Sequence, residues 1–309
     1  MQRFATVVIA LLAVIGGYSP VGSQSRTKSI RQDVQQAQKV RKEIAVTFDE
    51  LPFAEAFVSG DHRAIVHTVI DVLQKHHVRA VGFAVGNKVA GAQDLLGEWL
   101  NASHGLGNLS YSHHDINDLS IEQFITDIRK GADVLQPMLD GFGQQKRYFR
   151  YPYLHYGSNI KTREEVGRFL SAYSTVVAHA SVVVEDYVFN LGFEKLGRKA
   201  DSAAYGKLRA EYVAHVMSRV ADVEKSSQKL LQRQCRQILQ LRMNRLNGAF
   251  LDDLLSAIEG NGYKFITLDA ALSDPVYQRA EAYYGARGRG YLDMIADSDP
   301  DLLPAEESK

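Results

Sequence analysis

The sequence has one cysteine, Cys235, among 309 residues. A single cysteine excludes any disulfide bond within the chain. Cys235 lies in the polar, helix-favouring run LLQRQCRQ, which contains no histidine that could activate a thiol. We therefore expect Cys235 to be structural. An exported chain without a disulfide suits the bacterial periplasm or the outside of the cell.

Excess charge of one sign is also missing. Thirty-six Lys and Arg residues balance thirty-six Asp and Glu residues, and the pI is about 7.2. The sequence has no basic run interleaved with aromatic residues, so the composition argues against nucleic-acid binding by bulk electrostatics. A neutral or weakly charged small partner is the better expectation.

A hydrophobic run long enough to span a bilayer is lacking at the N-terminus. The apolar run from Phe4 to Ile15 follows Arg3, and small residues suited to cleavage lie near Ser23. These features predict a signal peptide over 1–23 and a periplasmic or extracellular protein with no stable membrane span. An uncleaved membrane anchor is the alternative, and no cysteine ends the run to carry a lipid.

Strand and helix patterns alternate along most of the chain. Apolar strand patterns are separated by helical patterns, and Ser120 with Gln123 forms a capping box at the start of one helix. This alternation favours βαβ units, a parallel sheet and the α/β class, and six or more such units favour a barrel. The strand patterns are EIAVTF, RAVGFAV, RYFRY, STVVAHASVVV, QILQL and KFITL.

The composition also divides the chain. A polar linker is expected over 24–42, a (β/α) barrel over 43–296 and an acidic, disordered tail over 297–309. A charged, helix-favouring stretch from about 192 to 237 contains no convincing strand, and it predicts a helical insertion in the barrel.

Polar residues follow four of the predicted strands, where a parallel barrel collects its active site. The four segments contain Asp49 and Glu50, the stretch GNLSYSHHD, Arg150 in FRYPYLHYG, and Glu185 with Asp186. Each has an ordinary alternative: a turn or capping pair of acids, a polar loop, or a structural ion pair. Their order and spacing along the chain give them weight together.

That order resembles the polysaccharide deacetylases of carbohydrate esterase family 4, from about Ile44 to Leu272. TFDELP is similar to the family's TFDD motif, LGNLSYSHHD to GNHTxSHPD, FRYPY to R-x-P-Y, and VVVEDY to D-x-x-D-W. QLRMNRLN followed by GYKFITLDAAL resembles the fifth motif, L-x-H, in a bacterial subgroup whose DPxY segment matches Asp274 to Tyr277. The resemblance implies a distorted (β/α) barrel that hydrolyses an N-acetyl group on a sugar.

The resemblance also implies roles for individual residues. In the family a divalent metal, usually zinc, activates water and polarises the amide. Asp49 matches the general base, and Glu50 and His113 match metal ligands. Arg150 matches the arginine that orients the base, itself held by a fourth-motif aspartate, of which Asp186 is retained. Tyr151, Tyr153, Tyr156 and Phe53 are candidate sugar-stacking residues, the first two being our predicted substrate-binding pair.

Four positions depart from the family pattern. Leu109 stands at the position of the first metal histidine, and Arg242 at that of the catalytic acid. Val183 replaces the first aspartate of the fourth motif and Tyr187 replaces its tryptophan. Leucine offers no lone pair to a metal, and arginine does not release a proton near neutral pH. Metal binding is therefore doubtful.

Two alternatives could rescue the chemistry. A rebuilt site would use Glu50 and His113 with either His114 or Asp115, although adjacent side chains rarely converge on one ion. His155 could supply the proton in place of the missing histidine. The sequence thus leaves open a weak N-deacetylase, a glycan-binding relative without activity, and a barrel with no glycan role.

Overall fold

The structure, a computed structural model, describes residues 42–54, 62–197 and 202–298. The predicted signal peptide, all but one residue of the linker and nearly all of the acidic tail lie outside these ranges. Among the described residues, no helix is both long and apolar enough to cross a membrane.

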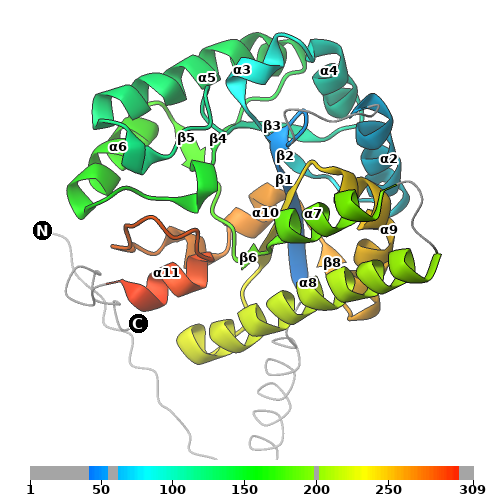
Figure 1. Cartoon of the computed structure of the whole chain (residues 1–309). Coiled ribbons are helices and arrows are strands. Elements are labelled where there is room, and N and C mark those ends of the chain that lie inside the picture. Colours follow the sequence, from blue (N-terminus) through cyan, green and yellow to red (C-terminus); the bar gives the residue numbers. More distant parts are fainter. Residues whose placement is uncertain (1–41, 55–61, 198–201, 299–309) are drawn as a thin grey trace, which may run out of the picture. The chain divides into compact units, whose positions relative to one another are not determined.

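Eight parallel strands form one curled sheet, which confirms the predicted α/β class and distorted (β/α) barrel (Figure 1). Seven strands follow one another across the sheet in the order β5-β4-β3-β2-β1-β7-β6, and β8 pairs with β1. β1 is central because its residues from Ile44 to Asp49 are fully buried and it pairs in register with β7 over six positions. The strands are β1 (Glu43–Leu51), β2 (Val81–Ala84), β3 (Gly105–Asn108), β4 (Arg147–Phe149), β5 (Thr175–Val177), β6 (Val182–Val183), β7 (Gln237–Arg242) and β8 (Lys264–Phe265).

The barrel is not closed by strand pairing in the part of the chain that the structure describes, because β5 and β6 end the sheet on opposite sides. The short connection between them hydrogen-bonds to β4 on one side and to β7 on the other, the strands next to the two ends of the sheet. Ala178 donates its N–H to the carbonyl of Phe149 at 2.8 Å, and Ser181 donates to the carbonyl of Ile238 at 3.0 Å. This connection brings the two edges of the sheet together around the site.

Helices cover the outer face of the sheet (Figure 1). The predicted capping box is confirmed: Ser120 accepts from the N–H of Gln123, and the Gln123 side chain accepts from the N–H of Ser120. The helices are α2 (His62–Lys75), α3 (Gly86–Val89), α4 (Gln93–Asn101), α5 (Ile121–Gly141), α6 (Ile160–Ala172), α7 (Asp186–Leu196), α8 (Ser202–Leu231), α9 (Arg245–Gly260), α10 (Leu268–Leu272) and α11 (Tyr291–Asp297), with 3-10 turns η1 (Ile116–Asp118), η2 (Pro152–Leu154) and η3 (Pro275–Gln278).

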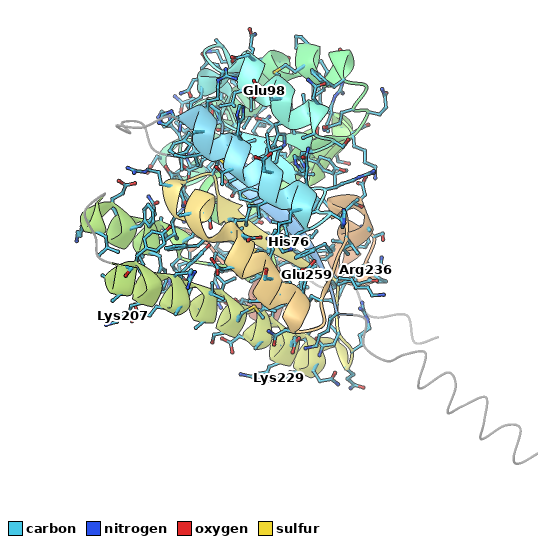
Figure 2. All side chains as sticks on the ribbon, turned by 90° about the vertical axis from the view of Figure 1, so that its right-hand side faces the viewer. His76, Glu98, Lys207, Lys229, Arg236 and Glu259 are labelled. Carbon is cyan, nitrogen blue, oxygen red and sulfur yellow. The ribbon has the colours of Figure 1, made fainter. Side chains whose placement is uncertain are left out.

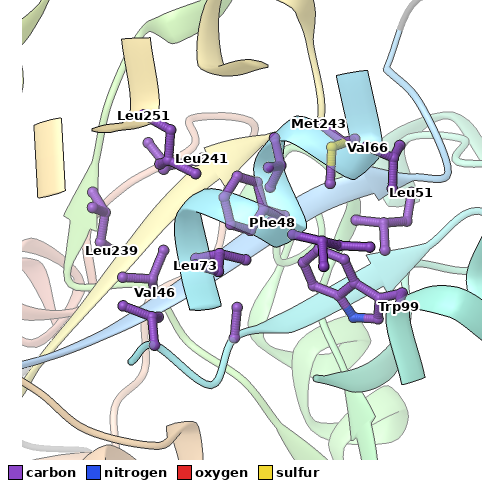
Figure 3. Close-up of a cluster of buried hydrophobic side chains, with 14 of the residues drawn as sticks. Val46, Phe48, Leu51, Val66, Leu73, Trp99, Leu239, Leu241, Met243 and Leu251 are labelled. Atoms are coloured by element: carbon purple, nitrogen blue, oxygen red, sulfur yellow. The ribbon is translucent and has the colours of Figure 1, made fainter. Parts of the chain in front are cut away.

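The larger core cluster packs between β1, β7 and the helices outside them. Phe48 of β1 lies at its centre, with its ring edge-on to Trp99 of α4 at a centroid distance of 5.9 Å, and Leu241 of β7 lies beside it (Figure 3). All three side chains are fully buried. This packing fixes β1, and therefore the residues that follow Phe48 at the end of the strand.

The helical insertion begins earlier than expected. The predicted range started near residue 192, whereas α7 begins at Asp186, directly after β6, and α8 ends at Leu231. α8 lies along the outside of the fold with Lys207 and Lys229 near its two ends (Figure 2). Tyr212, Val216 and Val220 attach it to the core. The same view shows His76 at the end of α2, whose ring nitrogen lies 3.0 Å from Glu259 of α9.

The last predicted strand is shorter than KFITL. β8 contains only two residues because Thr267 already caps α10, its side chain accepting from the N–H of Ala270. β3, with the sequence GLGN, precedes the loop GNLSYSHHD that we expected to follow a strand, but it is not among the recognised strand patterns.

Candidate functional site

Because all strands are parallel, their carboxyl ends and the loops that follow them lie at one end of the barrel. The structure places there the predicted candidates of the first, third and fourth segments, together with the loop that follows β3. Within the site, the charged side chains form two groups. Asp49 and Arg150 make the first, and Glu50, Asp186 and Arg242 make the second.

The first group is a buried ion pair. Arg150 is fully buried, and its Nη1 donates to Asp49 Oδ1 at 2.6 Å and to Thr47 Oγ1 at 2.8 Å. The guanidinium lies over the ring of Phe83 at 4.1 Å, and Nε donates to the carbonyl of Ala178 at 3.0 Å. The remaining Asp49 oxygen accepts from Gln240 of β7. Asp49 is thus oriented on both oxygens, one held by Arg150 and the other by Gln240.

The second group is built around Arg242, at the end of β7. Its Nη1 donates to Asp186 Oδ1 at 2.6 Å, its backbone N–H donates to Asp186 Oδ2 at 2.7 Å, and its Nε donates to Glu50 Oε1 at 3.1 Å. The guanidinium also lies 5.0 Å from the centre of the Tyr187 ring. One arginine therefore bridges the predicted metal carboxylate and the retained aspartate.

This pairing corrects one expectation. The family pattern implied that a fourth-motif aspartate would hold Arg150, but Asp186 pairs with Arg242 instead. Asp186 is fully buried at the first position of α7, and Asn247 of α9 donates to it at 2.8 Å. Arg150 makes its ion pair with Asp49 alone among the described residues. Asp186 therefore supports the acid position and not the base.

Burial raises the pKa of Asp186 and of Glu50, and the positive charge of Arg242 opposes the rise in both. Burial also lowers the pKa of His113 to about 4. The imidazole is therefore neutral at pH 7, and its ring packs against Tyr153 at a centroid distance of 4.7 Å.

The residues present do not fit the family's metal. Leu109 is buried among core side chains and offers no ligand, so Glu50 and His113 are the two family ligand positions that remain. Of these, Glu50 is already paired with Arg242. A catalytic zinc takes three protein ligands and water. In the described ranges no group of three or more His, Cys, Asp or Glu side chains is placed to hold an ion.

The proposed rebuilt sites are also contradicted. Asp115 does not turn toward Glu50; its carboxylate accepts from His155 and from Asn117. His114 is exposed. Neither residue completes a set of three ligands with Glu50 and His113.

A cleft of about 570 Å³ opens beside the second group. Tyr153 and Tyr187, on its lining, expose 49% and 51% of their surface. Its lining includes Glu50, Tyr153, His155, Tyr187, Gln240 and Arg242.

Only Tyr153 of the predicted sugar-stacking residues reaches this cleft. Tyr151, Tyr156 and Phe53 are almost completely buried, so the prediction for Tyr151 as a substrate-binding residue is wrong. The ring of Tyr151 packs in the core against Phe124, Phe149 and Tyr156. The η2 turn separates the two tyrosines: Tyr151 precedes it and points inward, whereas Tyr153 lies within it.

Unfavourable backbone geometry gathers in these loops. Positive φ angles cost energy in residues other than glycine, and they persist where the surrounding structure demands them. Five such residues lie at the end of β1 or after β3 and β4: Glu50 (64°), Ser110 (63°), His113 (60°), Tyr153 (57°) and Leu154 (54°).

Three side chains that hold the site residues in place were not predicted from the sequence. Gln240 holds Asp49, Asn247 holds Asp186, and the Tyr212 hydroxyl donates to Asn247 from α8. The signal for Gln240 was a polar residue inside the apolar strand QILQL. Asn247 and Tyr212 lie on helices, and nothing in their local pattern indicates which way they point.

Comparison with known proteins gives a consistent picture. The sequence model described as polysaccharide deacetylase matches residues 36–167. Peptidoglycan-N-acetylglucosamine deacetylase PgdA of Listeria monocytogenes is 22% identical over 75% of this chain and 39% of its own length. A chitin deacetylase of Colletotrichum lindemuthianum is 28% identical over 36% of this chain and 42% of its own. The chain thus spans about two fifths of these curated relatives.

Solved structures share the fold. BA3943, described as a CE4 family pseudoenzyme from Bacillus anthracis, has a TM-score of 0.51 at 16% identity, covering 75% of this chain and 66% of that one. A BA3943 mutant described as having restored enzymatic activity gives the same TM-score. Peptidoglycan deacetylase PdaC from Bacillus subtilis has a TM-score of 0.50 at 20% identity, covering 75% of this chain and 90% of that one.

Proposed function

The chain belongs to the polysaccharide deacetylase family, as its motifs predict, and from this premise we propose that its cleft binds an N-acetylated glycan without efficiently hydrolysing it. The family reaction is metal-dependent hydrolysis of the amide C–N bond. One observation carries the proposal: Arg242 forms ion pairs with both Glu50 and Asp186.

Arg242 weakens the reaction at two points. Its cation already neutralises Glu50, so a metal would have to displace the guanidinium from its carboxylate as well as do without the ligand missing at Leu109. At the acid position its own charge is permanent, so it cannot protonate a leaving amine near pH 7. The neutralised Glu50 and the missing acid would each slow the reaction, and one side chain, Arg242, accounts for both.

The cleft retains features suited to a sugar. Tyr153 and Tyr187 offer exposed aromatic faces, which pack well against the apolar face of a pyranose ring. Gln240, Asn244 and Arg242 add amide and guanidinium groups along the same lining for sugar hydroxyls or an acetamido group. The lining is polar enough to hydrogen-bond and aromatic enough to stack.

We place the protein outside the cytoplasm, in the periplasm or beyond. This part of the proposal rests on the N-terminal sequence alone, namely Arg3, the apolar run and the small residues near Ser23. Expression of the full chain and detection of a shortened mature form outside the cytoplasm would support it. An unshortened cytoplasmic chain would contradict it.

Calorimetric titration with N-acetylated chito-oligosaccharides tests binding. We expect Tyr153→Ala and Tyr187→Ala each to weaken binding by roughly fivefold, since a stacked aromatic side chain contributes about 1 kcal/mol. Tyr173→Ala is the matched control, because Tyr173 is equally exposed at 48% but does not line the cleft. No binding by the folded wild-type protein, or equal losses in all three variants, would contradict a glycan-binding cleft.

A weak deacetylase is the second candidate, favoured by one observation. The base arrangement is complete, with Asp49 held by Arg150 on one oxygen and by Gln240 on the other. If this candidate is correct, acetate release from the same N-acetylated oligosaccharides rises with added Zn²⁺ or Co²⁺ and stops on chelation.

A further inference from the structure

A pocket of about 260 Å³ lies away from the cleft, between α5, α6 and the strands that these helices cover (Figure 1). The buried part of its lining includes Leu106 of β3 and Ile128 and Leu135 of α5. Phe169 of α6 and Tyr173, directly after that helix, line it on the other side. The pocket shares no lining residue with the cleft, so it is a separate site.

The pocket is open because the seam between the two helices contains a small residue. The residues of α5 that line this seam are Arg129, Ala132, Asp133 and Gln136. Helical positions three and four apart share one face, so these side chains form a single row along the pocket. Ala132 is the smallest of the row, and its methyl group leaves space that a longer apolar side chain would fill.

The size and lining of the pocket suit a small aromatic molecule. A cavity of about 150 Å³ lined by leucine, isoleucine and phenylalanine is large enough to hold benzene, and this pocket is larger. Tyr148, Phe169 and Tyr173 add aromatic rings, against which another ring packs edge-on or in an offset stack. The Tyr148 hydroxyl donates to Asp269 at 2.5 Å, so its polar end is already satisfied.

The charge of the lining favours an anion. The charged lining residues are Arg129, Arg147 and Asp133. Two cations and one anion leave one positive charge. The Arg129 guanidinium lies 5.6 Å from the centre of the Phe169 ring and 5.9 Å from that of Tyr173, which holds it beside the aromatic side of the pocket. With the part of the chain that the structure describes, this guanidinium forms no hydrogen bond or ion pair, so its donors are free for a ligand.

We propose that this pocket binds a small aromatic carboxylate, with its ring against the apolar lining and its carboxylate on Arg129. The parallel N–H donors of a guanidinium match the two oxygens of a carboxylate, so one arginine can hold the group through two hydrogen bonds. A sugar or an inorganic anion would leave the apolar lining unfilled, and a neutral ring would leave the cation unpaired. Such a ligand binds whether or not a glycan occupies the cleft.

Ligand-observed NMR titration of the full chain with naphthoate tests the pocket, and naphthamide is the neutral probe of the same shape. We expect saturable binding of naphthoate with a Kd of about 1 mM or below, as its size allows. The amide should bind roughly fivefold more weakly, because it lacks an ion pair that remains partly exposed. Equal affinities for the two probes, or binding that does not saturate, would overturn the proposal.

Arg129→Met removes the charge and keeps a long side chain against the two rings. We expect the affinity for naphthoate to fall roughly fivefold and the affinity for naphthamide to stay unchanged. Arg168→Met is the matched control, because Arg168 is exposed on α6 and does not line the pocket. Equal losses in the two variants would mean that only the overall charge matters, which contradicts the contact with Arg129.

Ala132→Leu fills the pocket. Leucine is nearly as favourable as alanine in a helix, and Ala132 is only half-buried, so the fold should persist and an unchanged melting temperature checks it. We expect both probes to bind at least tenfold more weakly. A folded Ala132→Leu protein with wild-type affinity for naphthoate would show that the probe binds elsewhere. Arg129→Met tests the same pocket without filling it.

Reciprocal variants separate this pocket from the cleft. Tyr173→Ala removes part of the pocket lining and should weaken naphthoate binding, while Tyr153→Ala, in the cleft, should leave it unchanged. An excess of N-acetylated chito-oligosaccharide should not displace naphthoate. Displacement by the oligosaccharide, or an equal loss of naphthoate affinity in Tyr153→Ala, would place the probe in the cleft and overturn the proposal.

Discussion

Replacing Arg242 with methionine would leave two carboxylates without their cation while keeping a side chain of similar length. Asp186 is fully buried and Arg242 is 20% exposed, so the pair lies largely outside bulk water. Removing one partner of a buried pair costs about 3–5 kcal/mol. Asp186 keeps the bonds from Asn247 and from the backbone N–H of residue 242. We therefore expect a loss near the low end, about 3 kcal/mol of unfolding free energy.

Urea unfolding followed by far-UV circular dichroism and by fluorescence measures this loss. Trp99 is the single tryptophan and is fully buried, so its emission reports on the core. In a thermal melt the same loss corresponds to roughly 6–12 °C for a domain of this size. The control is Arg245→Met, which breaks a partly exposed pair with Glu194 and should cost at most about 1 kcal/mol.

The penalty should also depend on pH. Without Arg242 the folded-state pKa of Asp186 and of Glu50 rises further, so each group becomes neutral at a higher pH. The destabilisation is therefore full at pH 8 and shrinks as the pH falls through these raised pKa values. Adding Asp186→Asn to Arg242→Met should restore part of the stability, because the unpaired charge is gone. A penalty under about 1 kcal/mol, or one equal at pH 8 and pH 5, would refute the reasoning.

Three further predictions concern the core and the motif departures. Burial lowers the pKa of His104 to about 4, so protonation of this one histidine should cost about 2 kcal/mol of unfolding free energy from pH 7.5 to 5, and urea titration should find the pH-dependent loss smaller by that amount in His104→Asn than in the wild-type protein. Burial raises the pKa of the Cys235 thiol to about 11, so a thiol reagent such as DTNB should react only after unfolding, and rapid reaction of the native protein would contradict this. Leu109→His with Arg242→His should create a zinc site, seen as a rise in melting temperature with added Zn²⁺; Leu109→His alone should give little rise because Arg242 still holds Glu50.

Much of the fold was predictable because apolar periodicity reports directly on burial. The pattern EIAVTF became the central strand β1, and the box at Ser120 opened α5 as expected. β3 was missed because the run GLGN has almost no side chains from which to judge a period. The start of α7 at Asp186 was not predicted, because Asp186 was interpreted as a site residue that follows a strand and not as the first residue of a helix.

The site was predictable in position but not in pairing. Strand-end motifs brought Asp49, Arg150 and Asp186 to one end of the barrel, since parallel strands share that end. Which carboxylate meets which arginine depends on side-chain direction across different strands, and no local pattern encodes it. Asp186 therefore met Arg242 and not Arg150. Burial of Tyr151 was hidden for the same reason, because two tyrosines two residues apart are separated only by the η2 turn.

Arg242 links the departures from the family pattern into one arrangement. Leu109 removes a metal ligand and fills core space, and Arg242 supplies a fixed positive charge to the remaining carboxylate, Glu50. A resident cation of this kind keeps the cleft intact without a metal, since Glu50 would otherwise be a largely buried, unpaired charge.

Zinc stoichiometry of the purified full-length protein, measured by elemental analysis alongside acetate release from N-acetylated chito-oligosaccharides, tests directly whether Arg242 has taken the place of the metal. We expect well under one zinc ion per chain after incubation with Zn²⁺ and dialysis, and no acetate from the N-acetyl group above the buffer rate. One zinc ion per chain, with N-acetate release that chelation abolishes, would contradict it.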